Sequence, residues 1–135
     1  MSTVLVLDDD PDLRILIRNA LESQSIEAVE AESVAQALRI VDEVGLDAAI
    51  VDGYLPDGRG LTFIESLRAR NRNIEIVFMS SECQDLRTFR QLTRELAVSL
   101  VLCKPFDPLE LASELRQLLT TPESSPADPQ SNPSR

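Results

Sequence analysis

The chain has 135 residues, of which 43% are hydrophobic and 27% are charged, and its formal net charge is −10. This size and composition predict one soluble globular domain with a sizeable core. The negative charge argues against a general nucleic-acid-binding surface. No apolar run is long enough to span a membrane, and the N-terminus lacks the basic start of a signal peptide. We therefore expect a cytoplasmic protein.

The sequence contains no histidine and two cysteines, Cys83 and Cys103. The absence of histidine excludes a His-based metal site, a Ser–His triad and phosphohistidine chemistry on this chain. The cysteines do not form a C-x-x-C pair, and without export signals we expect free thiols in a reducing compartment. Cys103 is expected to be a small core residue.

The first part of the chain alternates predicted strands and helices. Residues 3–7 form a strand, and Asp10-Pro11 then begins a helix, with Asp10 as the N-cap. The expected apolar face of this helix consists of Leu13, Leu16, Ile17, Ala20 and Leu21. A second strand, 26–31, alternates apolar and acidic residues. The Ser33-x-x-Gln36 capping box then begins a helix with the apolar residues Val34, Ala37, Leu38 and Val41.

The second part continues this alternation from a buried strand at 47–51. Gly58 and Gly60 mark a loop, and a third helix follows. Further strands are expected at 74–79 and 99–103, and Asp107-Pro108 caps a last helix. The apolar faces of these three helices are expected to be Leu61, Ile64 and Leu67; then Phe89, Leu92, Thr93 and Leu96; then Leu111, Leu115, Leu118 and Leu119.

This order predicts an α/β fold of five strand–helix units, a doubly wound parallel sheet covered on both faces. The folded domain is expected to comprise residues 1–121. Residues 122–135 are rich in proline and serine and are expected to be a disordered tail or linker.

Polar residues follow several of the strands: Asp8, Asp9 and Asp10 the first, Asp52 the third, Ser80 and Ser81 the fourth, and Lys104 the fifth. Ligands of parallel sheets bind at the carboxyl ends of the strands. Two like charges about 4 Å apart repel by roughly 1 kcal/mol even in water. Carboxylates from two strand ends therefore predict a hard cation such as Mg²⁺. The alternative is an exposed acidic loop in which Asp10 only caps the helix.

Lys104, the one lysine of the chain, can pair with a carboxylate or a phosphate oxygen. A serine hydroxyl can donate a hydrogen bond to the same oxygen. An aspartate beside a metal ion and a lysine can act as a nucleophile toward phosphorus.

The stretches VLVLDDDPDLR, AIVDGYLPDGRG, VFMSSE and VLCKPF, in this order and spacing, resemble the receiver domain of two-component response regulators of the chemotaxis-regulator type. The resemblance covers about residues 2–120 and implies the flavodoxin-like strand order 2-1-3-4-5. It implies phosphorylation of Asp52, with Mg²⁺ held by Asp8, Asp9, Asp52 and the main-chain carbonyl of Tyr54. It also implies that Ser80 and Lys104 contact the phosphoryl group and that the Lys104–Pro105 bond is cis.

Other positions match family residues with modulating roles. Tyr54 and Glu82 lie where side chains tune the lifetime of the phosphoryl group. Val101 replaces the usual aromatic switch residue that works with the hydroxyl at Ser80, and a β-branched side chain is stiff. The signal is then expected to pass through the loop around residues 80–82 and the fourth helix. Arg59, Ala97 and Leu100 also depart from the family pattern.

The resemblance implies a signalling domain and not an enzyme. Its phosphoryl donor would be a sensor histidine kinase or a histidine phosphotransfer protein, and its output would be the face of the fourth helix, fifth strand and fifth helix. The output partner would be a protein or a further domain, with no direct nucleic-acid or membrane contact. One alternative is a pseudo-receiver that binds partners without phosphorylation. Another is a Mg²⁺-dependent phosphohydrolase, which needs a second aspartate where Tyr54 stands.

Overall fold

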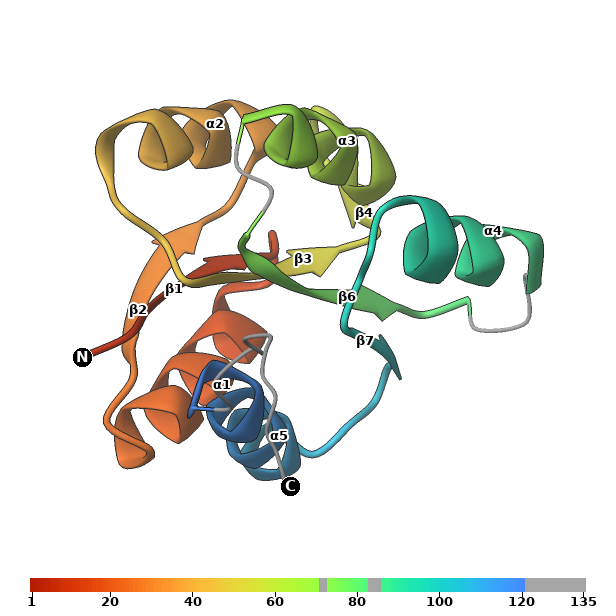
Figure 1. Cartoon of the computed structure of the whole chain (residues 1–135). Helices are drawn as coiled ribbons and strands as arrows, with labels where there is room; N and C mark the ends of the chain where they lie inside the picture. The colour runs from red at the N-terminus through yellow and green to blue at the C-terminus, as the bar shows by residue number, and fades with distance from the viewer. Residues whose placement is uncertain (71–72, 83–85, 121–135) are drawn as a thin grey trace, which may run out of the picture.

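A parallel sheet forms the centre of the fold, with helices on both of its faces (Figure 1). The computed structural model describes residues 1–70, 73–82 and 86–120. Within them, one sheet has the strand order β2-β1-β3-β6-β7. Its strands are β1 (Thr3–Leu7), β2 (Glu27–Ala31), β3 (Ala48–Asp52), β6 (Glu75–Ser80) and β7 (Leu100–Cys103). Counted among these five alone, the order is 2-1-3-4-5, which confirms the predicted flavodoxin-like fold.

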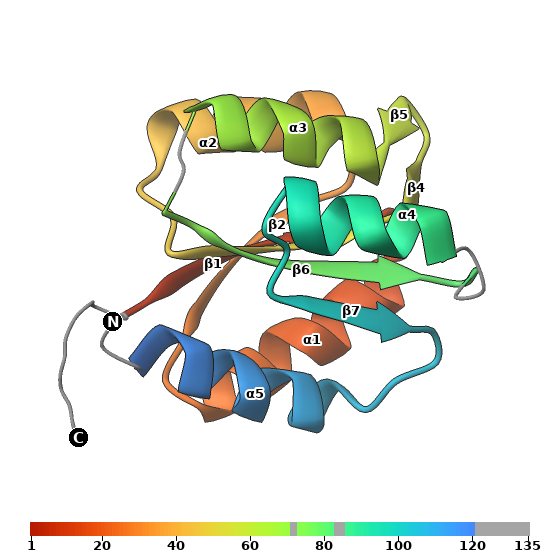
Figure 2. The ribbon, with the colours of Figure 1, turned by 45° about the vertical axis from the view of Figure 1, so that its right-hand side comes forward.

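Two helical layers cover the sheet (Figure 2). On one face lie α2 (Val34–Glu43), α3 (Gly60–Arg70) and α4 (Leu86–Arg90), and on the other lie α1 (Pro11–Ser23) and α5 (Pro108–Thr120). Side chains alternate along each strand, so β1 sends Leu5 and Leu7 into one core and Val4 and Val6 into the other. The predicted tail, 122–135, lies outside the described residues.

Both predicted helix starts in the first half of the chain are present. The Asp10 carboxylate accepts hydrogen bonds from the backbone N–H groups of Asp12 and Leu13, and Pro11 is the first helical residue. The Ser33 hydroxyl accepts from Gln36 N–H at 3.2 Å. Asp57 provides a second cap that was not predicted. Its carboxylate accepts hydrogen bonds from the first two N–H groups of α2, at 2.8 and 3.0 Å.

Some expectations about packing were wrong. Leu16 is 56% exposed, because the sheet and α5 cover only the stripe of α1 that contains Ile17, Ala20 and Leu21. Phe89 is 47% exposed although Leu92 is buried. The helix changes to π-helical turns at Gln91–Glu95, so a period of 3.6 residues no longer places Phe89 on the buried face.

A short hairpin stands where a plain loop was expected after β3. Its strands are β4 (Tyr54–Leu55) and β5 (Gly58–Arg59), which pair antiparallel. The hairpin leads directly into α3 at Gly60. Two-residue strands carry too little periodicity to be predicted from the sequence.

The expectations for Cys103 were also wrong. This residue is exposed and disulfide-bonded, so it is neither a core residue nor a free thiol. It ends the edge strand β7, where side chains reach solvent. Cys83 lies outside the described residues. None of the helices in the described part of the chain has the length and apolar character that crossing a bilayer requires.

Arg68 of α3 joins the end of the π-helical turns to the loop before β6. Its guanidinium donates to the carbonyl oxygens of Leu96, Ala97 and Ile74 at 2.7, 2.9 and 2.8 Å. Arg68→Met should lower the free energy of unfolding by about 2 kcal/mol, because the three carbonyls lose their donors and the bonds to Leu96 and Ile74 are partly buried. Urea unfolding measures the change. Arg70→Met is the matched control, since Arg70 makes an exposed ion pair with Asp42 and should change stability by less than about 0.5 kcal/mol. Equal effects of the two substitutions would contradict this assignment.

Candidate functional site

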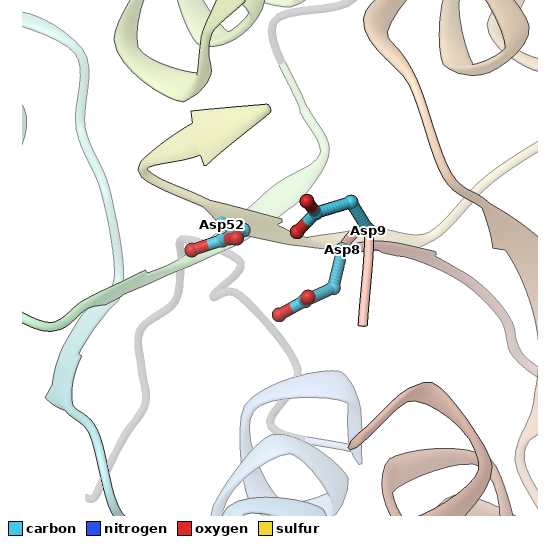
Figure 3. Close-up of side chains that lie close together, drawn as sticks. All are labelled: Asp8, Asp9 and Asp52. Atoms are coloured by element: carbon cyan, nitrogen blue, oxygen red, sulfur yellow. The ribbon is translucent and has the colours of Figure 1, made fainter. Parts of the chain in front are cut away.

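Three aspartates from two neighbouring strand ends meet at one edge of the sheet (Figure 3). Asp8 follows β1 and Asp52 ends β3, and these strands are adjacent in parallel register. Each of Asp8, Asp9 and Asp52 contributes one carboxylate oxygen, and these three oxygens all lie within 4.8 Å of one another. Asp8 and Asp52 are buried, at 0% and 6% exposure, and Asp9 is exposed. We call these three residues the acidic cluster. An exposed acidic loop, the alternative reading, does not describe Asp8 and Asp52.

Lys104 reaches the same place from the end of β7. Its ammonium Nζ lies 3.0 Å from Asp8 Oδ2 and 3.1 Å from Asp52 Oδ1. Its backbone N–H donates to Ser80 O at 2.8 Å, and the Lys104–Pro105 peptide bond is cis, as the resemblance implied. One ammonium among three carboxylates leaves the site net negative, which suits a further cation.

The environment shifts the acidity of both partners in this ion pair. Burial raises the pKa of Asp52, the charge of Asp8 raises it further, and Lys104 offsets only part of this. Burial lowers the pKa of Lys104, but its hydrogen bonds to Asp8 and Asp52 outweigh burial, so the pKa is raised overall. Lys104 is therefore a firmly charged group, whereas charge on Asp52 costs stability.

Asp52→Asn should raise the free energy of unfolding of the metal-free protein by about 1–2 kcal/mol near neutral pH. A carboxyl whose pKa is raised by folding stabilises the fold while it is protonated, and this contribution is lost as pH rises through the folded-state pKa. The wild type therefore carries an unfavourable charge that the amide lacks. Urea unfolding in EDTA should show that the variant's advantage shrinks toward about pH 4. A difference that is independent of pH would contradict this account.

Ser80 ends β6, beside Asp52 of β3, and its side chain folds onto the following turn. The hydroxyl accepts from Glu82 N–H at 2.9 Å and donates to Glu82 O at 3.0 Å. Tyr54 Oη donates to Glu82 Oε1 at 3.1 Å, and the Arg59 guanidinium lies 5.7 Å from the centre of the Tyr54 ring. Tyr54 and Glu82, the two residues predicted to tune the lifetime of the phosphoryl group, are thus hydrogen-bonded to each other, and Glu82 belongs to the same turn as Ser80.

Val101 occupies a different place. It is the second residue of β7, paired in register with Phe78 of β6, and it packs in the core on the α4 side of the sheet. Arg14 was not predicted as a site residue, but its guanidinium donates to the Asp8 carbonyl at 2.6 Å and pairs with Glu30 at 3.0 Å. A basic residue one helical turn after a strand-end aspartate is the signal that could have found it.

The family description "response regulator receiver domain" matches residues 4–116. The phosphate regulon transcriptional regulatory protein PhoB of Klebsiella pneumoniae is 30% identical over 118 residues, which are 86% of this chain and 51% of PhoB. The transcriptional regulatory protein CpxR of Escherichia coli (strain K12) is 28% identical over 119 residues, 88% of this chain and 50% of CpxR. The chain thus spans about half the length of these curated relatives.

Two solved structures are also similar to this chain. The crystal structure of a sensor protein from Polaromonas sp. JS666 is 33% identical, with a TM-score of 0.75 over 87% of this chain and 95% of that one. A CheY-like response regulator receiver domain protein from Methanospirillum hungatei JF-1 has a TM-score of 0.80 at 18% identity, over 88% of this chain and 94% of that one. The latter likeness supports the fold alone.

Proposed function

Because this chain belongs to the response regulator receiver domain family, we propose that it is a phosphoacceptor domain of a two-component system, phosphorylated on Asp52. The donor would be a sensor histidine kinase or a histidine phosphotransfer protein. The observation that carries the proposal is the meeting of Asp52, Asp8 and Lys104, from three strand ends, within 3.1 Å contacts of one ammonium group.

The residues have distinct roles in the proposed transfer. A carboxylate oxygen of Asp52 attacks phosphorus, the bond from phosphorus to the donor's histidine nitrogen breaks, and an aspartyl phosphate forms. Lys104 moves from carboxylate to phosphoryl oxygen and balances the charge of the transferred group. The Ser80 hydroxyl exchanges its bonds with the Glu82 backbone for a bond to the phosphoryl group. That exchange would change the turn at 80–82 and the start of α4.

The acidic cluster fits Mg²⁺, which prefers oxygen ligands and takes one or two carboxylates together with phosphate oxygens. Asp8, Asp9 and Asp52 would hold the ion, with the main-chain carbonyl of Tyr54 as a further ligand. When bound, Mg²⁺ neutralises charge on the transferring group. Zinc or copper sites would be expected to include histidine or cysteine ligands, and the cluster contains neither.

Output would pass through α4, β7 and α5 to a partner protein or to a further domain, without direct contact to nucleic acid or membrane, in the cytoplasm. The domain would signal by shifting an equilibrium between two packings of this face. A pseudo-receiver, which binds partners without phosphorylation, is the second candidate, and Val101 at the usual aromatic position is the observation that favours it. A phosphohydrolase is disfavoured by Tyr54 at the position of the required second aspartate.

The test is the intact mass of the protein after incubation with acetyl phosphate and Mg²⁺. We expect one phosphoryl adduct of about 80 Da that requires Mg²⁺ and that is absent from Asp52→Asn. Asp10→Asn is the matched control, because Asp10 caps α1 and lies outside the acidic cluster; it should still be phosphorylated. If no adduct forms with acetyl phosphate or with a phosphorylated histidine phosphotransfer protein, the pseudo-receiver reading replaces this one.

A further inference from the structure

A cavity lies between α4 and the β4–β5 hairpin, which occupy the same face of the sheet (Figure 2). Its volume is about 280 Å³, and its apolar wall comprises Leu61, Phe78, Leu92 and Val101. Phe78 and Leu92 are only 6% and 1% exposed, so the wall is part of the protein core. For comparison, an engineered apolar cavity of about 150 Å³ binds benzene. The cavity is therefore large enough for an aromatic ring.

The small side chain of Val101 contributes to the volume of this cavity. Its partner in the sheet register is Phe78, and both side chains belong to the core on the α4 side. Side chains stand roughly perpendicular to a strand, so a residue at 101 projects from β7 toward the cavity. Valine is short, β-branched and restricted in χ1, so its side chain lines the cavity without filling it.

The mouth of the cavity favours a flat, uncharged molecule. Tyr54 and Phe89 line it and are 50% and 47% exposed, so two rings are available for stacking. The mouth also carries one positive and one negative side chain, Arg59 and Glu82. These balance each other and give no preference for a charged ligand. Tyr54 is held in place by its hydrogen bond to Glu82 and by Arg59 over its ring.

We propose that this cavity is a binding site for an uncharged planar aromatic molecule of one or two rings. The wall includes Gly53 and Ser80, which follow β3 and end β6 beside Asp52. A bound molecule therefore contacts the segment that carries Asp52 and the turn that contains Ser80. Binding itself needs neither phosphorylation nor metal, so its test is independent of the proposed function.

Indole is a suitable probe because the chain has no tryptophan and only one tyrosine, Tyr54. Titration of the full chain in EDTA should give saturable, blue-shifted indole emission with a Kd at or below about 1 mM. Tyr54 emission should be quenched over the same range. Val101→Phe fills the cavity and should weaken binding by at least about tenfold, without lowering the melting temperature. Leu109→Phe, which adds a ring at a 62% exposed position of α5, should bind as the wild type does.

Three results would overturn the proposal. The first is the absence of saturable binding to the wild type, and the second is equal binding by Val101→Phe. The third concerns Phe89, whose own ring is the alternative occupant of the cavity: Phe89→Ala should bind indole no more tightly than the wild type, and tightening by about tenfold or more would assign the cavity to Phe89. If circular dichroism shows that Val101→Phe is unfolded, Leu61→Phe fills the cavity from the opposite wall and carries the same expectation.

Discussion

Lys104→Met is expected to slow phosphoryl transfer to Asp52 about 100-fold. It is also expected to lower the free energy of unfolding of the metal-free protein by about 2–3 kcal/mol. The methyl thioether keeps much of the side-chain volume, so the loss reports the ammonium group. That group contacts both Asp8 and Asp52, and without it two buried carboxylates lose their counter-charge. The stability loss is smaller than for a fully buried pair because the Lys104 side chain is 23% exposed.

The stability loss should depend on pH. Without Lys104, the two largest influences on the pKa of Asp52, burial and the charge of Asp8, both raise it, and only the backbone N–H of Gly53 still lowers it. A carboxyl with a raised pKa destabilises the fold more as pH rises through that pKa. The difference between Lys104→Met and the wild type in EDTA should therefore be largest near neutral pH and should shrink as the pH is lowered and Asp52 takes up a proton.

Urea unfolding at neutral and at acidic pH measures the stability effect, and the initial rate of adduct formation measures the effect on phosphoryl transfer. Lys104→Arg is the control for charge: it should keep most of the stability, but its planar guanidinium cannot replace a compact ammonium between two carboxylates, so transfer should still be slowed. A Lys104→Met variant that is phosphorylated at the wild-type rate would remove Lys104 from the proposed mechanism. Equal stability would mean that solvent already compensates the carboxylates.

The sequence predicted the features that depend on regular periodicity and on strand ends. Apolar strands alternating with amphipathic helices defined the sheet, and its parallel order brought Asp8, Asp52 and Lys104 together because all three follow strands at one edge. The N-caps at Asp10 and Ser33 were also predicted correctly, because the residue types at a helix start follow a short sequence pattern. Each is a local pattern with a direct structural consequence.

The features that were missed depend on tertiary contacts or on irregular backbone. The π-helical turns after Arg90 change which residues face the core, and no residue pattern marks them. Arg68 acts through three carbonyls that are distant along the chain or lie in turns. The cavity beside Val101 is the space that side chains from several helices and strands leave unfilled. The sequence showed the missing aromatic ring at Val101 but not the shape that remains without it.

Gly60→Ala is expected to lower the free energy of unfolding by about 3 kcal/mol. Gly60 begins α3, and its N–H donates to Gly53 O at 2.9 Å. A Cβ atom at this position would lie 2.0 Å from the Asp52 carbonyl oxygen and 3.1 Å from Val51 Cγ1. The nearest atom is backbone in a central strand, so it cannot move aside as a flexible side chain would. Either α3 or the end of β3 must shift.

The shift should also reach the proposed chemistry, because the displaced carbonyl belongs to Asp52 itself. We expect Gly60→Ala to be phosphorylated more slowly than the wild type even in the fraction that is folded. Gly45→Ala is the matched control: a Cβ there meets no atom within 4 Å, so its stability should change by less than about 0.5 kcal/mol. Urea unfolding compares the two variants. If Gly60→Ala lowers the free energy of unfolding no more than Gly45→Ala does, then α3 can shift over β3 without loss of stability. The position of Asp52 would then be held by Lys104 and the sheet alone.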